Sequence, residues 1–456
     1  MTANTTPRLA SVDFLRGLVM VLMALDHSRG MISGSHIDPT DLSQASPALF
    51  LTRWCTHFCA PVFVFLAGTG AFLYLARGKS IMDVSRFLWT RGLWLILLEF
   101  TLVRFGWAFR FQTPVLVGQV IWALGWSMIL LAGLVYLPTV AVACFGIAMI
   151  TLHNLLDGLS AEQFGPLAWL WGILHGGYKF QAGAGLEFLP VYPLVPWVGV
   201  MAAGYGFGPL LLLDFKLRRR ILAWLGLGLI AAFILLRASN FYGDPRPWSP
   251  QNNLLFSCFS FVNCTKYPPS LLYLLMTLGP AILLLAAVGP VTQSAGPKPE
   301  APFLPGRIVP PPEQPQKGSS ASPLLLTTST TVSAASPEQV RVAAKVRSAE
   351  RPGSNAWPPS IPALLARPFI IFGRVPMFYY LLHVPLIHLL AAVVSYPQAG
   401  IALGSFYFTH PAAADYGHGL GVVYGVWITT VLLLFPLCAW FAKVKQARRY
   451  AWLSYL

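Results

Sequence analysis

Charged residues are scarce in this chain of 456 residues: only 10% are Asp, Glu, Lys or Arg, whereas 56% are hydrophobic. A soluble domain carries about 25% charged residues, so the composition indicates a polytopic membrane protein. Cysteine is also scarce, and the six cysteines include no Cys-x-x-Cys pair and no Cys/His cluster at zinc spacing. This excludes a disulfide scaffold and argues against a metal site. Because acidic Asp13 precedes the first apolar run and no small-residue cleavage site follows it, we expect no cleavable signal peptide.

Acidic residues are fewer than basic ones, and the formal net charge is +15. In a membrane protein Lys and Arg gather in cytoplasmic loops, so the basic excess reflects topology and we expect no nucleic-acid partner. A span needs about 20 apolar residues. On that rule we predict an all-α fold, a polytopic bundle of ten transmembrane helices in the plasma (inner) membrane with both termini cytoplasmic. The predicted spans are residues 14–33, 58–76, 87–106, 115–137, 139–156, 190–213, 219–239, 269–291, 367–395 and 418–442.

A polar stretch divides the chain into three parts. Residues 292–360 are rich in Pro, Ser, Ala and Gly and have no apolar period. Such a composition cannot bury a core, so we predict a disordered cytoplasmic linker without chemistry. Residues 1–291 then hold the first eight spans and the catalytic core. Residues 361–456 hold the last two spans and a cytoplasmic tail.

The first span carries ionisable groups within the run RLASVDFLRGLVMVLMALDHSRG. A charge at the bilayer centre costs roughly 2.5–3.5 kcal/mol, and such residues usually face a bundle interior or a wet cavity. Arg16 and His27 are eleven residues apart, which places them roughly 16 Å apart along one helix face. This arrangement suits a substrate that enters anionic end first from the cytoplasm and reacts near the outer side. The alternative is that Arg16 snorkels to the inner surface while Asp26 and His27 are wet residues at the helix end.

Other segments repeat this pattern of polar residues. The ninth span places Arg374 near the inner side and His383 deeper, and the third adds Arg91 and Glu99 on one face. The plainer interpretation of His383 is a hydrogen-bonded core histidine. That of Arg91 and Glu99 is a structural polar pair. The outer loop after the seventh span contains four residues that could recognise a sugar, namely Asp244, Arg246, Lys266 and Tyr267. Aromatic residues also belt the interface of any membrane protein, and Cys258 and Cys264 in the same loop could form a disulfide.

Five motifs in this order resemble bacterial relatives of heparan-α-glucosaminide N-acetyltransferase. They are RLASVDFLRGL, RWCTHFCAPVFVFLAG, YPLVPWVGVMAAGYGFG, KYPPSLLYLLMTLGP and GRVPMFYYLLHVPLIH. The Arg-Gly pair followed by a histidine is also similar to the wider acyltransferase 3 family. The resemblance implies that Arg16 and His27 are needed to move an acyl group across the membrane to an outer sugar. In the glucosaminide enzyme an Asn stands in place of His27, so His36 in the outer loop is an alternative base.

The main hypothesis is a membrane acyltransferase that uses acyl-CoA, most simply acetyl-CoA. Its phosphates would bind Arg16, Arg91 and Arg374, because guanidinium binds phosphate bidentately. His27, oriented by His383 or Tyr380, would deprotonate a hydroxyl or amine of an outer sugar or glycan, and Asp26 would contact that acceptor. Whether the acyl group rests on a histidine, and whether the chain forms a homodimer, stay open. The alternatives are a transporter with an Arg/His-lined path and a structural membrane protein without a site.

The linker gives the first testable prediction. Deleting residues 292–360 should leave acyl transfer unchanged, because the predicted chemistry lies entirely in the spans and outer loops. The measurement is transfer from acetyl-CoA by purified full-length and shortened protein with matched thermal unfolding curves. Loss of transfer by a normally folded deletion variant would show that these residues are more than a tether.

Overall fold

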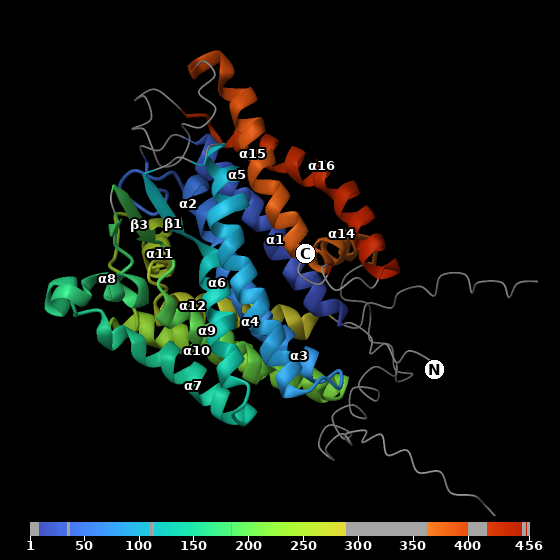
Figure 1. The fold of residues 1–456 in the computed structure, drawn as a ribbon. Coiled ribbons are helices and arrows are strands. Elements are labelled where there is room, and N and C mark those ends of the chain that lie inside the picture. Colours follow the sequence, from blue (N-terminus) through green and yellow to red (C-terminus); the bar gives the residue numbers. More distant parts are fainter. Residues whose placement is uncertain are drawn as a thin grey trace, which may run out of the picture.

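The computed structural model describes residues 9–33, 37–109, 111, 114–183, 185–288, 363–399, 417–448 and 453. In this part the chain folds into a helical bundle with one small sheet (Figure 1). Each of the ten predicted spans coincides with a helical segment. Within the described ranges, six helical segments are long and apolar enough to cross a membrane, and α6 and α12 are apolar but shorter. The all-α membrane fold is thus confirmed, whereas the number of spans and the side of the termini stay predictions. The predicted linker lies outside the described residues.

Helix α1 runs through the centre of the bundle. It spans Ala10–Ile32. Its neighbours are α2 (Pro47–Thr56), α3 (Cys59–Leu75), α12 (Leu271–Ala287), α14 (Ala363–Arg374), α15 (Pro376–Ala399) and α16 (Leu420–Ala447). Two glycines bring α1 and α14 close together, because a methyl group on Gly17 would overlap the Phe369 carbonyl and one on Gly373 would overlap that of Asp13. Small residues at such crossings let helix backbones approach in membranes. The central position fixes both ends of α1 against neighbouring helices.

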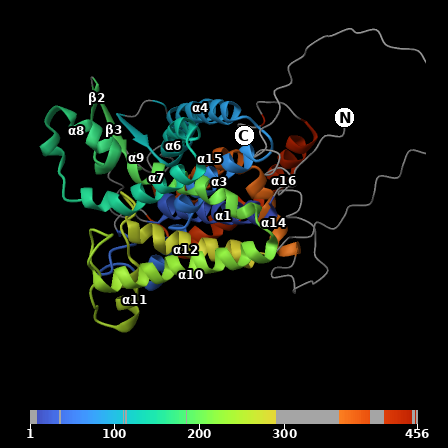
Figure 2. The same cartoon turned by 90° about the horizontal axis from the view of Figure 1, so that it is seen from below.

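The remaining helices pack around this centre in pairs (Figure 2). Their bounds are α4 Ile81–Leu98, η1 Glu99–Val103, α5 Arg104–Ala108, α6 Val120–Leu134, α7 Thr139–Leu152, η2 His153–Leu156, α9 Leu194–Phe207, η5 Gly208–Leu212 and α10 Phe215–Ser239. Helix α4 packs on α6, α9 lies between α3 and α7, and α10 packs on α12. The π-helical segment η1 joins α4 to α5, and α5 packs against α15.

A sheet and several short helices gather at one end of the bundle, on the left in Figures 1 and 2. The sheet consists of β1 (Val115–Gly118), β2 (Phe180–Gly183) and β3 (Leu186–Pro190), and the helices are η3 (Ala161–Leu167), α8 (Ala168–Trp171), η4 (Gly172–Gly176) and α11 (Leu254–Val262). The strand order is β1-β3-β2, with β1 parallel and β2 antiparallel to β3. Topology predicts that this end faces outward, and it holds the C-terminal end of α1.

The structure corrects several predicted elements. The ninth span is two helices, because Pro376 disfavours a helical conformation at the preceding Val375 and cannot donate a backbone hydrogen bond. The predicted fourth span begins as strand β1, and helix α6 starts only at Val120. The sheet and α11 were not predicted. Both Cys258 and Cys264 are free thiols, so the disulfide considered for them is not formed.

Close helix packing gives a second prediction. A methyl group on Gly68 of α3 would overlap the Met201 carbonyl of α9, whereas Gly228 on α10 has open space around its Cα. Gly68→Ala should therefore lower the free energy of unfolding by roughly 1–3 kcal/mol, the usual cost of overpacking. Gly228→Ala, the matched control, should be neutral or slightly stabilising. Thermal unfolding in detergent, followed by tryptophan fluorescence, compares them; equal unfolding temperatures would refute the close contact.

Candidate functional site

Two histidines from different helices form a direct hydrogen bond at the predicted outer end of α1. His27 Nδ1 lies 2.7 Å from His383 Nε2 of α15. His383 Nδ1 lies 2.8 Å from the Tyr380 carbonyl and 3.2 Å from that of Tyr379. A carbonyl can only accept, so His383 donates from Nδ1, and in a neutral pair its Nε2 accepts from His27 Nδ1. The network therefore leaves the lone pair of His27 on Nε2.

Aromatic rings enclose this pair. Trp107 of α5 meets the His27 ring edge-on with centroids 4.9 Å apart, and Tyr379 stacks on His383 at 5.2 Å. His383 is fully buried, whereas His27 keeps partial exposure. Of the two rings, His27 is thus the one that a substrate can reach. Of the two residues expected to orient His27, the structure places His383 in hydrogen-bond contact with it, and the orienting role itself stays a prediction.

Asp26, the neighbour of His27, is the centre of a cationic cluster. Its carboxylate accepts from Arg53 Nη1 at 2.6 and 2.8 Å, from Arg29 Nη2 at 3.1 Å and from Thr56 Oγ1 at 2.9 Å. Lys266 Nζ lies 3.8 Å from the same carboxylate. The cluster joins α1, α2 and the segment before α12. The contact of Asp26 with an acceptor stays a prediction, and the structure shows that its carboxylate ties these three segments together.

Lys266 and Tyr267 lie together beside this cluster. Lys266 is 7% exposed, and its Nζ lies 5.2 Å from the centroid of the Tyr267 ring. The Tyr267 hydroxyl lies 3.4 Å from that of Tyr192. Burial raises the pKa of the Tyr267 hydroxyl, but the Lys266 ammonium and the Arg53 guanidinium outweigh that effect and leave the pKa below its usual value. Of the four predicted sugar-binding residues, Lys266 therefore contacts Asp26 and Tyr267 lies next to Lys266.

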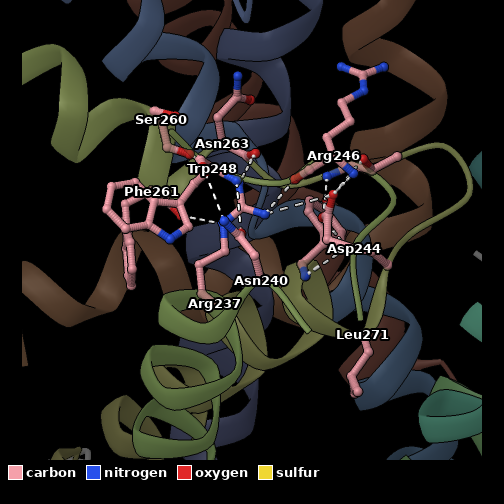
Figure 3. Close-up of polar contacts among 12 residues, drawn as sticks. Arg237, Asn240, Asp244, Arg246, Trp248, Ser260, Phe261, Asn263 and Leu271 are labelled. Atoms are coloured by element: carbon pink, nitrogen blue, oxygen red, sulfur yellow. Dashed lines mark hydrogen bonds and ion pairs between the residues drawn. The ribbon is translucent and has the colours of Figure 1, made fainter. Parts of the chain in front are cut away.

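The other two, Asp244 and Arg246, belong to a structural network in the outer loop (Figure 3). The Asp244 side chain is 1% exposed, and it accepts hydrogen bonds from Thr265 and Ser270. The Arg246 carbonyl accepts from Arg237 Nη1 at 2.7 Å. The Asp244 carboxylate is thus occupied by protein groups, and the structure does not bring it to the histidine pair.

The predicted phosphate-binding arginines lie on three helices. Arg16 of α1 contacts Asp13 at 3.5 Å and donates to the Leu66 carbonyl of α3 at 3.4 Å. Arg374 ends α14, and its Nε is buried without a hydrogen bond among the described residues. Arg91 of α4 lies 5.6 Å from the ring of Phe87. Arg16 and Arg374 lie near the same helix crossing, because Gly373, which precedes Arg374, packs against the backbone of Asp13, which contacts Arg16. Arg91 lies on α4, which packs against α6.

The family described as heparan-alpha-glucosaminide N-acetyltransferase, catalytic, matches residues 8–237, half of the chain. The chain belongs to this family. No curated protein matches it.

Membership of the heparan-α-glucosaminide N-acetyltransferase family decides between the functional hypotheses. The chain is an acyltransferase-type enzyme of the membrane, and the transporter alternative loses its support. The matched residues include α1, α2 and α3, and thus Arg16, Asp26 and His27. They end at residue 237, so the match does not reach His383 or Lys266.

In this member of the family several residues of the site were missed by sequence reasoning. Arg53, Thr56 and Arg29 surround Asp26, and Arg237 is 1% exposed in the membrane helix α10. Arg53 and Thr56 stand in the motif RWCTHFC, where their spacing of three residues places them on one helix face. An arginine deep in an apolar helix is itself a signal, and it would have identified Arg237. His36 lies outside the described residues.

The charges around Tyr267 give a third prediction. In Lys266→Gln the pKa of Tyr267 should rise, because the variant loses a cation that stabilises the phenolate. Ultraviolet absorbance titration measures this, with the difference from Tyr267→Phe isolating the one tyrosine. Lys179→Gln, which alters an exposed pair with Glu187 on the sheet, should leave the titration in place. An unchanged Tyr267 titration in Lys266→Gln would contradict the assigned cause.

Proposed function

We propose that the chain transfers an acetyl group from cytoplasmic acetyl-CoA to a hydroxyl or amine of an extracytoplasmic sugar or glycan in the plasma membrane. The observation that carries the proposal is the His27–His383 hydrogen bond of 2.7 Å, in a chain of an N-acetyltransferase family. A base at neutral pH is what such a transfer requires of the protein.

His27 is the proposed general base. Its Nε2 takes the proton of the acceptor hydroxyl or amine as the acceptor oxygen or nitrogen attacks the thioester carbonyl. The carbon–sulfur bond of the thioester breaks, a carbon–oxygen or carbon–nitrogen bond forms, and the thiolate leaves and takes up a proton. His383 keeps the His27 proton on Nδ1 throughout, so Nε2 stays the reactive atom. His36 remains the alternative base that the family resemblance names.

Arg16 and Arg374 are proposed to bind the phosphates of the donor. Guanidinium groups suit phosphate because they donate several parallel hydrogen bonds. The buried Arg374 Nε has no hydrogen bond among the described residues, which fits a group that awaits an anionic partner. Arg91 is proposed to contribute from α4. On the outer side, Asp26, Lys266 and Tyr267 are proposed to contact the acceptor.

The histidine pair gives the fourth prediction. His27→Ala should lower acetyl transfer by roughly 10²–10⁴-fold, the usual contribution of a general base, with acetyl-CoA binding retained. His383→Asn should lower transfer less, because it disturbs only the orientation of His27. Purified protein, labelled acetyl-CoA and an amino-sugar acceptor measure transfer, and equilibrium binding measures the donor.

A third histidine provides the matched control. His175 is buried in an outer segment and contacts Asp157 at 3.0 Å, away from α1 and α15. His175→Asn should keep transfer near that of the unchanged protein. Full transfer by a folded His27→Ala variant would remove His27 from the mechanism.

A further inference from the structure

Lys266 is held at the cationic cluster by a short turn. The Ser270 amide donates to the Thr265 carbonyl at 3.0 Å, and Lys266 and Pro269 form a backbone bridge across the turn. Lys266 Nζ lies 3.8 Å from Asp26 and, among the residues that the structure describes, donates no hydrogen bond. Its ammonium therefore keeps donors available beside Asp26, the neighbour of His27 in the sequence. A lysine has four flexible carbons, so its placement depends on how firmly the turn is fixed.

Asp244 fixes both ends of this turn. Its Oδ2 accepts from the Thr265 amide at 2.8 Å and from Ser270 Oγ at 2.6 Å, and its Oδ1 accepts from Thr265 Oγ1 at 3.0 Å. Hydrogen bonds to an ionised carboxylate are stronger than neutral ones. One buried carboxylate thus closes the turn 265–270 at its two ends, and Lys266 directly follows one of these ends.

Arg237 holds both Asp244 and the surrounding backbone in place (Figure 3). Its guanidinium lies 3.9 Å from Asp244 Oδ1. It also donates at 2.7–3.0 Å to four backbone carbonyls, those of Arg246, Ser260, Phe261 and Asn263. A fully buried ion pair is a poor source of stability, because desolvation offsets the attraction, and its best-attested use is to fix a particular geometry. This favours a positioning role over a purely stabilising one.

We propose that Arg237 and Asp244 are positioning residues that keep the Lys266 ammonium beside Asp26 and His27. From there the ammonium can donate to the carbonyl oxygen that gains negative charge when the acceptor attacks. The inference rests on the proposed acetyl transfer for that last step. The geometric part, that Asp244 controls where Lys266 lies, is independent of any activity.

The geometric part is tested by amine labelling of the full-length protein. Because Lys266 is buried, an acylating reagent should modify it slowly, as read by peptide mass spectrometry. Asp244→Asn should speed this labelling about tenfold or more, the factor that corresponds to losing one charge-assisted hydrogen bond. Glu187→Gln, which alters an exposed pair on β3, should leave it unchanged. Unchanged Lys266 labelling in Asp244→Asn overturns the proposal, whatever the protein transfers.

A milder variant covers the case in which Asp244→Asn does not fold. Thr265→Val removes the hydroxyl bond to Asp244 but keeps the amide bond. It should raise Lys266 labelling by a smaller factor. Labelling equal to that of the unchanged protein again overturns the proposal.

The catalytic part is tested by a double-mutant cycle on kcat/KM for acetyl transfer. If Asp244 acts through Lys266, Lys266→Gln and Asp244→Asn each lower transfer, and the double variant is no worse than Lys266→Gln alone. Multiplied losses in the double variant would show independent roles and overturn the proposal. Absence of transfer by the unchanged protein would instead remove the proposed function, and the labelling result would still stand.

Discussion

The carboxylate of Asp26 is the interaction on which the outer end of this bundle depends. Arg29 reaches it from the same helix, Arg53 from α2 and Lys266 from the turn before α12. Removing one partner from a buried ion pair usually costs roughly 3–5 kcal/mol, because it leaves an uncompensated charge. The cluster therefore makes three segments that are distant in sequence hold one arrangement, and it does so directly beside His27.

Asp26 and His27 can serve separate networks because they are consecutive residues of one helix. Adjacent side chains on an α-helix diverge by about 100°. Asp26 accordingly faces α2 and the turn, while His27 faces α15 and Trp107. One short stretch of α1 thus connects a charged cluster, which joins three segments, to the hydrogen-bonded histidine pair. The ionisable groups in this apolar helix are explained by protein partners on two sides.

Sequence reasoning found the helices because length and apolarity are local properties, but it missed the contacts that join distant segments. Strands β1 and β3 pair in parallel across an intervening stretch of helices, and no local pattern reports such a pairing. His27 and His383 were anticipated because an ionisable residue in a span stands out alone. The partners of Asp26 were only partly anticipated, since Arg53 becomes significant once α2 lies against α1. Asp244 illustrates the converse: an exposed-loop acid by sequence is a buried anchor in the structure.

The partner of His383 also constrains the chemistry. In a catalytic triad a carboxylate orients the histidine and stabilises the imidazolium that forms. Here His383 donates to backbone carbonyls, with distances of 2.8 and 3.2 Å to Tyr380 and Tyr379. A carbonyl fixes the tautomer but supplies no full negative charge. The carboxylate of Asp26, the neighbour of His27 in the sequence, is paired with its own cations. In the proposed mechanism, a base supported in this way gains little by holding a proton and must pass it on quickly, and the leaving thiolate is an acceptor that the reaction itself provides.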